Sequence, residues 1–164
     1  VLERNYDYFL SLEQDVIPPL DIIKKFIQHN KKVITGIYFN HHPGIDEPLP
    51  LAFIETGDKK YGLRTLSEEE LDSNQLIKIS ACGLGCMLIA RDVLERIKFR
   101  IDPKFDEFDD MPFCRDLRDN KIELYADTSV KCVHLLRDRP WSWADLVPPK
   151  KIPELKKAEL HDGS

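Results

Sequence analysis

The stretch that decides the fold is YFLSLEQDVIPPLDIIKKFIQHNKKVITGIYF, residues 8–39. It opens with the β-rich run Tyr8–Leu12 and closes with a second run, Val33–Phe39. Two prolines after the first run suit the entry to a helix, where backbone N–H donors are not needed. The segment between the runs carries apolar residues at helical spacing: Ile23, Phe26 and Ile27. A strand, a helix and a strand within roughly 30 residues predict an α/β sheet.

The rest of the chain supplies further elements for such a sheet. Apolar or β-branched runs predict strands over Leu51–Thr56, Ile77–Ala81, Cys86–Ala90, Ile122–Tyr125 and Val130–Val133, the last ending at His134. A capping-box pattern at Ser67 predicts a short helix. Apolar residues at helical spacing predict two more helices, one over Arg91–Lys98 and one carrying Phe113, Cys114 and Leu117.

Composition narrows the class of protein. The 164 residues indicate one domain, and 42% hydrophobic with 32% charged residues excludes a wholly disordered or fibrous chain. A formal charge of -5 argues against nonspecific binding of nucleic acid. No apolar run reaches the roughly 18–20 residues that span a bilayer, and the opening residues do not form a signal peptide. Four cysteines without a CxxC pair favour buried thiols in a reducing compartment, the cytoplasm.

Two carboxylates follow the first predicted strand. Glu13 and Asp15 are two residues apart, so both project to one side if extended geometry persists. Such acceptor-only oxygens suit Mg2+ or Mn2+, and α/β folds place ligands at the C-terminal edge of parallel strands. The same residues also fit a solvated turn in which Asp15 caps the following helix.

Three other positions could carry chemistry. Asp109 and Asp110 precede a predicted helix, where carboxylates are favoured electrostatically, and one of them could act as a general base. His134 could be a metal ligand through neutral imidazole or a satisfied structural residue. Gly83 and Gly85 permit close backbone approach. The sequence contains no GxGxxG, GxSxG, HExxH or Walker A pattern.

The order of these pieces resembles the family-2-type glycosyltransferases with the GT-A fold. LSLEQDVIPPLDIIKKFI is similar to their DxD strand and the helix after it, and VITGIYF is similar to their next strand. ISACGLGCMLIARDVLERI resembles the segment that lines the acceptor side of their cleft. FDEFDDMPFCRDLRDNKIELYADTSVKCVH resembles their acidic "ED" helix, two strands and histidine. The resemblance runs from Tyr8 to His134 and implies a mixed, Rossmann-like α/β sheet flanked by helices.

The resemblance also implies a metal-dependent active site. Glu13 and Asp15 occupy the acidic places of the DxD signature, and His134 matches the histidine that completes the metal site in some members. Asp110 matches the base of inverting enzymes, with Asp109 as its acidic neighbour. The expected cofactor is Mn2+ or Mg2+.

The substrates implied by the resemblance are a nucleotide-diphosphate sugar and a hydroxyl acceptor on a glycan, a lipid-linked molecule or a protein. The loop of Gly83, Leu84, Gly85 and Cys86 would lie beside the donor sugar and the acceptor. Nucleic acid is not an expected partner. The expected location is the cytoplasm, including the cytoplasmic face of a membrane.

The chain departs from the family pattern at several points. Glu13 stands where the first Asp of DxD is usual, Asp109 stands where Glu is commoner, and Asp116 falls where an arginine is often found. The family's first βαβ units, which bind the nucleotide, have no counterpart here. A complete domain would need on the order of another 70–100 residues upstream. We therefore expect a partial GT-A-like domain over 1–136 and a charged, Pro- and Trp-containing tail over 137–164.

Other functions fit parts of the same pattern. A noncatalytic sugar- or protein-binding module on a truncated GT-A scaffold would explain both the missing nucleotide half and the glutamate in the DxD-like motif. A metal-dependent phosphoryl enzyme would explain the carboxylates, but it accounts poorly for the GLGC and histidine segments.

Overall fold

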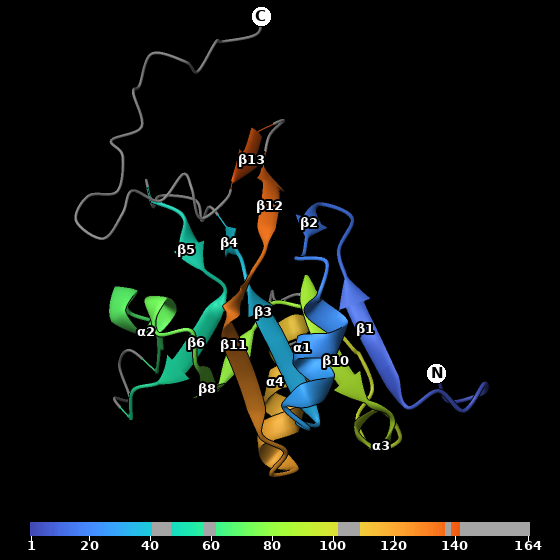
Figure 1. The fold of residues 1–164 in the computed structure, drawn as a ribbon. Coiled ribbons are helices and arrows are strands. Elements are labelled where there is room, and N and C mark those ends of the chain that lie inside the picture. Colours follow the sequence, from blue (N-terminus) through green and yellow to red (C-terminus); the bar gives the residue numbers. More distant parts are fainter. Residues whose placement is uncertain (41–46, 58–61, 102–108, 137–138, 142–164) are drawn as a thin grey trace, which may run out of the picture.

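The computed structural model describes residues 1–40, 47–57, 62–101, 109–136 and 139–141. They form a mixed α/β architecture with helices flanking a central sheet (Figure 1). The strands are β1 (Tyr8–Leu12), β2 (Val16–Ile17), β3 (Val33–Ile37), β4 (Phe39–Asn40), β5 (Leu49–Pro50), β6 (Ala52–Glu55), β7 (Leu63–Thr65), β8 (Leu76–Ile79), β9 (Ala81–Cys82), β10 (Cys86–Ala90), β11 (Leu124–Lys131), β12 (Val133–Leu136) and β13 (Arg139–Trp141). The helices are α1 (Ile22–Gln28), α2 (Glu68–Asp72), α3 (Arg91–Leu94) and α4 (Asp110–Asp119).

The central sheet has five strands in the order β1-β10-β3-β11-β8. β10 is antiparallel to both β1 and β3, whereas β11 is parallel to β3. The segment β1-α1-β3 is therefore the predicted strand–helix–strand unit, but β10, from much later in the chain, lies between its two strands. This mixed sheet agrees with the expected α/β class.

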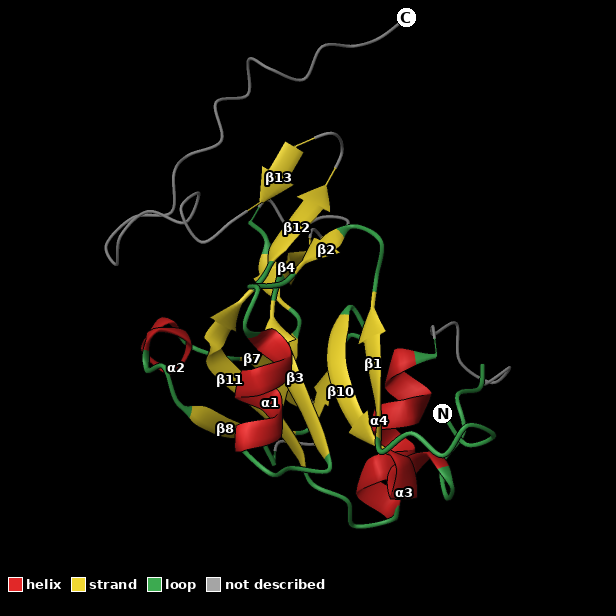
Figure 2. Cartoon of the chain, turned by 45° about the vertical axis from the view of Figure 1, so that its right-hand side comes forward, coloured by secondary structure: helices red, strands yellow, loops and turns green. Residues whose placement is uncertain are grey.

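Helices α1 and α4 cover opposite faces of the sheet (Figure 2). β3 is fully buried, and its side chains alternate between the two faces. Ile34 packs with Phe26 on the α1 side, while Val33 and Ile37 pack with Phe113 on the α4 side. The four cysteines are free and buried in these cores, as predicted: Cys82, Cys86, Cys114 and Cys132.

The predicted apolar face of α1 is wrong by about one residue. Ile22 and Phe26 face the sheet, whereas Ile23 is 53% exposed and Ile27 is 47% exposed. The helix carries apolar residues on more than one side, so periodicity alone did not fix which of them meet the sheet. The helix expected over Arg91–Lys98 is also shorter, since α3 ends at Leu94.

The two strands expected at the end of the chain are divided differently. Residues 124–131 form one strand, because Asp127 and Thr128 are buried inside it rather than lying in a turn. The Asp127 carboxylate accepts a hydrogen bond from the Ser129 N–H (2.9 Å), and the Thr128 hydroxyl donates to the Gln75 carbonyl (3.0 Å). These bonds satisfy the buried polar groups. His134 is the second residue of β12 and does not end a strand.

A second, three-stranded sheet of order β13-β12-β2 stands above the central one (Figure 1). β12 pairs antiparallel with β2, placing His134 opposite Val16. This pairing brings His134 beside the turn that follows β1. Of the predicted tail 137–164, only β13 lies within the described residues, and it pairs with β12.

Helix α2 confirms the predicted capping box and yields a test of pH dependence. The Ser67 hydroxyl accepts from the Glu70 N–H (3.3 Å), and the Glu70 carboxylate accepts from the Ser67 N–H (2.7 Å). Arg64 binds the same carboxylate through two nitrogens, at 2.7 and 2.8 Å. The Arg64 hydrogen bonds, followed by those from Ser67, lower the pKa of Glu70 to about 2.

We expect Glu70→Gln to lower the free energy of unfolding at pH 7 by about 1 kcal/mol, as for a lost helix cap. Because the folded pKa of Glu70 is depressed, its contribution is present above the ordinary value of 4.5 and is lost as pH falls toward about 2. Urea unfolding of both proteins should show the difference shrinking over that range. Glu68→Gln, in the same first turn, should cost less; an equal cost would contradict the capping account.

Candidate metal centre

Three side chains gather where β1 ends and β12 begins. One ligand atom from each of Glu13, Asp15 and His134 lies within 4.8 Å of the others. Backbone bonds fix the arrangement: the Glu13 N–H donates to the Gly85 carbonyl (3.1 Å), and the Leu135 N–H donates to the Asp15 carbonyl (2.8 Å). The turn after β1 is thereby tied to Gly85, just before β10, and to Leu135 of β12, so residues about 120 positions apart meet.

The hydrogen bonding of His134 shows which of its ring nitrogens carries a hydrogen and which faces a carboxylate. Its Nδ1 lies 2.5 Å from the Phe39 carbonyl oxygen, which can only accept, so Nδ1 carries a hydrogen. The other nitrogen, Nε2, lies 3.4 Å from Asp15 Oδ2. In the neutral ring, Nε2 carries a lone pair that faces the carboxylate of Asp15. That contact is favourable only with a cation between the two groups or with a second proton on the ring.

The donor set fits a divalent cation. Glu13 and Asp15 offer hard oxygen ligands, which suit Mn2+ and Mg2+, and His134 offers an imidazole nitrogen whose other nitrogen is held by a carbonyl. The imidazole favours Mn2+ over Mg2+, which prefers oxygen and water ligands. His134 is 5% exposed, whereas the Asp15 side chain is 45% exposed. The centre is therefore anchored on its histidine side and open to solvent on its aspartate side.

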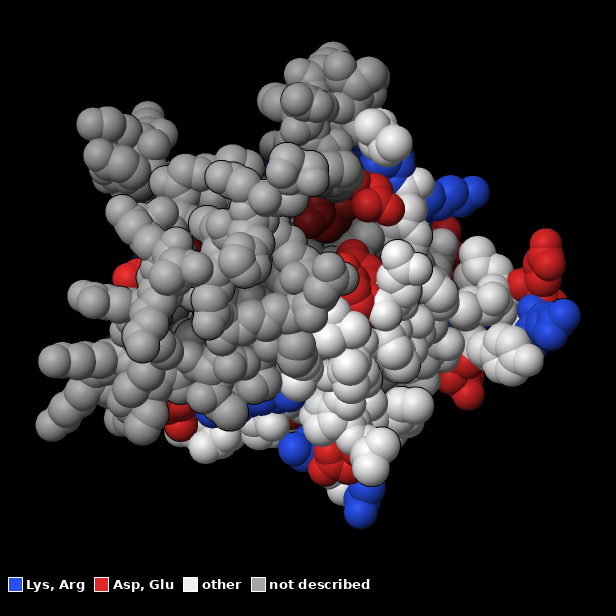
Figure 3. All heavy atoms as spheres, turned by 90° about the horizontal axis from the view of Figure 1, so that it is seen from above, with Lys and Arg blue, Asp and Glu red and all other residues white. Residues whose placement is uncertain are grey.

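The predicted base lies on the same side of the molecule. Glu13 has a raised pKa, chiefly because its carboxylate is partly buried and secondly because Asp15 is close. His134 opposes this rise, and Asp110 and Asp109 add to it. The start of α4 is thus near enough for its carboxylates to act on Glu13. Seen from above, acidic atoms lie in a hollow of the surface (Figure 3).

Asp109 and Asp110 also lie at the start of a helix, as the sequence predicted. Asp109 is the N-cap residue of α4, and the Asp110 carboxylate accepts from the Met111 N–H at 2.7 Å. Both aspartates are half-buried. A helix N-terminus favours negative charge, although the Asp109 side chain makes no cap hydrogen bond.

The loop Gly83–Cys86 is buried throughout. Its glycines lie against Tyr38, whose hydroxyl accepts a hydrogen bond from the Gly85 N–H at 2.8 Å. Tyr38 was not among the predicted site residues. The paired glycines signalled a close approach of the backbone, but nothing in the sequence identified which side chain makes it. The expected role of this loop in substrate binding stays a prediction.

Comparison with solved structures shows a likeness in fold. No family model matches the chain, and no curated protein matches it. The solved structure titled "Crystal Structure of A197 from STIV" superposes with a TM-score of 0.55 at 24% sequence identity. The chain shares the fold of that protein. The match covers 86% of this chain and 64% of the other, so this chain spans less than two thirds of that protein's length.

Within the described ranges, no helix is both long enough and apolar enough to cross a bilayer.

Proposed function

We propose that the chain is the catalytic and acceptor-binding part of a GT-A-type glycosyltransferase that transfers a sugar from a nucleotide diphosphate to a hydroxyl. The observation that carries the proposal is that His134 Nε2 and the carboxylates of Glu13 and Asp15 lie close enough together to hold one cation. The ordered motif resemblance supports the same function. The fold likeness is compatible with it and adds no information about the reaction.

In the proposed site, Glu13, Asp15 and His134 would hold Mn2+ or Mg2+. When bound, the ion neutralises negative charge on the departing diphosphate. Asp110, near the same centre, would accept the proton of the acceptor hydroxyl. The bond from the acceptor oxygen to the anomeric carbon forms as the bond from that carbon to the phosphate oxygen breaks. The diphosphate leaves with the electron pair, and attack from the opposite side inverts the anomeric centre.

One observation favours a second candidate, a noncatalytic sugar- or protein-binding module. The four residues from Gly83 to Cys86, expected beside the donor sugar, are buried. A scaffold that had lost donor binding would have no use for an open loop at this position. The module would keep the acidic hollow as a binding surface without carrying out transfer.

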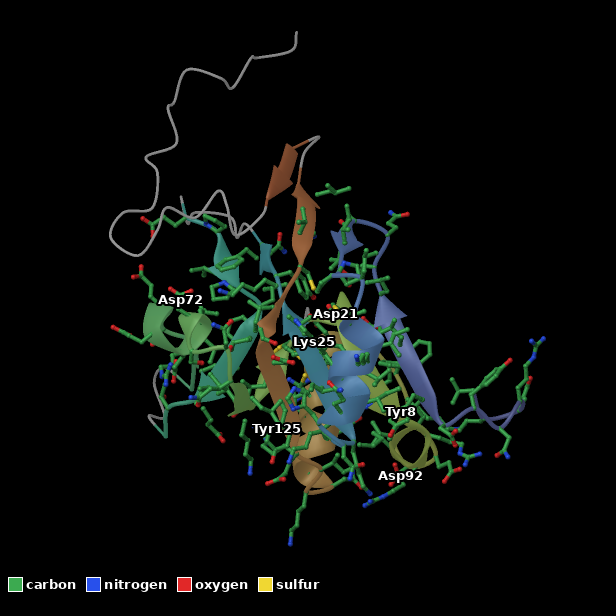
Figure 4. All side chains as sticks on the ribbon, in the orientation of Figure 1. Tyr8, Asp21, Lys25, Asp72, Asp92 and Tyr125 are labelled. Atoms are coloured by element: carbon green, nitrogen blue, oxygen red, sulfur yellow. The ribbon has the colours of Figure 1, made fainter. Side chains whose placement is uncertain are left out.

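Calorimetric titration with a panel of UDP-, GDP- and TDP-sugars separates the two functions. The glycosyltransferase predicts saturable binding of at least one donor in Mn2+, weaker binding in EDTA, and a further loss in Asp15→Asn. Binding of free glycans alone, unaffected by Mn2+, would support the module and contradict the enzyme. Asp21→Asn is the matched control, because Asp21 lies outside the cluster. Its Oδ2 is 3.6 Å from Nζ of Lys25 on α1 (Figure 4).

A further inference from the structure

Tyr38 contacts the histidine of the candidate metal centre and the glycine that lies beside its glutamate. It follows β3 directly and is only 1% exposed. Its ring meets the His134 ring edge-on, with centroids 5.4 Å apart and planes at 88°. The next residue, Phe39, supplies the carbonyl that holds His134 Nδ1. Two consecutive residues therefore fix the orientation of the imidazole ring, one by packing and one by hydrogen bonding.

The hydroxyl end of Tyr38 is linked to Glu13 through Gly85. Its hydroxyl oxygen accepts from the Gly85 N–H, and the Gly85 carbonyl accepts from the Glu13 N–H. A Cβ atom added at Gly85 would lie 2.7 Å from Tyr38 Cζ and 3.0 Å from Glu13 Oε2. The tyrosine, the glycine and the carboxylate are thus packed without space for even a methyl group. A shift of the tyrosine hydroxyl would move the glycine and with it the glutamate.

The chemistry of the hydroxyl suits this position. The Tyr38 hydroxyl is an uncharged polar group in a buried position, where it accepts a hydrogen bond from the Gly85 N–H. A neutral hydroxyl accepts the Gly85 hydrogen bond without adding negative charge to an acidic cluster. A carboxylate at the same place would add such charge, and a phenylalanine would leave a buried N–H without its acceptor.

We propose that Tyr38 is a positioning residue that holds Glu13 and His134 in the geometry that binds a divalent cation. The inference rests on the proposed metal centre and adds a residue that touches neither the ion nor the substrate. Its effect is transmitted through Gly85 on one side and through the imidazole ring on the other.

The test is the Kd for Mn2+ in Tyr38→Phe, measured by electron paramagnetic resonance well below the unfolding temperature of each protein. We expect affinity to fall on the order of 10-fold, at the lower end of what loss of a ligand-orienting contact costs. Tyr125→Phe is the matched control. It removes the exposed hydroxyl with which Tyr125 of β11 donates to Glu123 (Figure 4), and it should leave the Kd unchanged.

A double-mutant cycle separates positioning from general destabilisation. If Tyr38 acts through Glu13, Tyr38→Phe should weaken Mn2+ binding much less in a Glu13→Gln background. Gly85→Ala, which disturbs the same contact from the other side, should reproduce the loss if Tyr38→Phe does not fold. Unchanged Mn2+ affinity in Tyr38→Phe with only a lower melting temperature would overturn the positioning role. Absence of Mn2+ binding by the wild-type protein would instead contradict the metal centre, and this inference with it.

Discussion

Replacing Asp110 by asparagine is expected to slow sugar transfer by roughly 10²–10⁴-fold, the usual contribution of a positioned general base. The amide keeps the size of the side chain and its hydrogen bond from the Met111 N–H, but it cannot take up the acceptor's proton. Donor affinity should change little, because Asp110 is not one of the three clustered ligands. The measurement is the initial rate with saturating donor and Mn2+.

The control for this prediction lies on the same helix. Asp119 is at the far end of α4 with a side chain 70% exposed, and Asp119→Asn should leave the rate within about twofold. If Asp110→Asn transfers sugar at the full rate, Asp110 is not the base of the reaction. An equal loss of rate and of donor binding would assign it to binding instead.

The second large effect concerns Glu13→Gln, which should be more stable than the wild type without metal and less stable than the wild type in Mn2+. In EDTA, Glu13→Gln should raise the free energy of unfolding by a few tenths to about 1 kcal/mol, allowing for solvent screening of an exposed residue. The reason is first the partial burial of the carboxylate and then the negative charges of Asp15, Asp110 and Asp109, which raise the pKa of Glu13 against the opposing effect of His134. A raised carboxyl pKa means that the ionised form costs stability, and the cost grows as pH rises above 4.5. Below that pH the two proteins should converge.

Mn2+ should reverse the order of the two proteins. A ligand at 100 times its Kd stabilises the folded state by about 2.7 kcal/mol, which the wild type should gain and Glu13→Gln should largely lose. Thermal unfolding of the wild type and of Glu13→Gln, in EDTA and in Mn2+, measures the difference in stability under both conditions. If Mn2+ raises the melting temperature of the two proteins equally, Glu13 does not hold the ion.

Local signals predicted those elements whose neighbours in sequence decide them. Strands Tyr8–Leu12 and Cys86–Ala90 have the expected bounds, because each is a short apolar run bounded by polar or glycine residues. The capping box at Ser67 formed because its partners are three residues apart. These features depend little on the rest of the chain.

Elements that depend on distant partners were predicted less well. The insertion of β10 between β1 and β3 depends on pairing over more than 50 residues, which periodicity does not encode. The polar Asp127 and Thr128 broke the predicted strand pattern, since the sequence does not show the bonds that satisfy them after burial. The face of α1 was set by contact with the sheet, not by its own apolar pattern.

The candidate site shows the same division. Each of Glu13, Asp15 and His134 had an ordinary structural explanation when taken alone, and only the order of motifs grouped them. Pairing of β12 with β2 then brought the three together. Tyr38 could not be predicted, because its role depends on a ring placed under Gly85 and beside His134 by three separate segments.

Titration of the chain with Mn2+, followed by electron paramagnetic resonance, tests the central claim most directly. We expect one saturable ion per chain in the wild type, a large loss of affinity in Asp15→Asn, and unchanged affinity in Asp21→Asn. No saturable binding by the wild-type chain, or equal binding by Asp15→Asn, would contradict it. In that case the contact between His134 Nε2 and Asp15 Oδ2 (3.4 Å) would be structural.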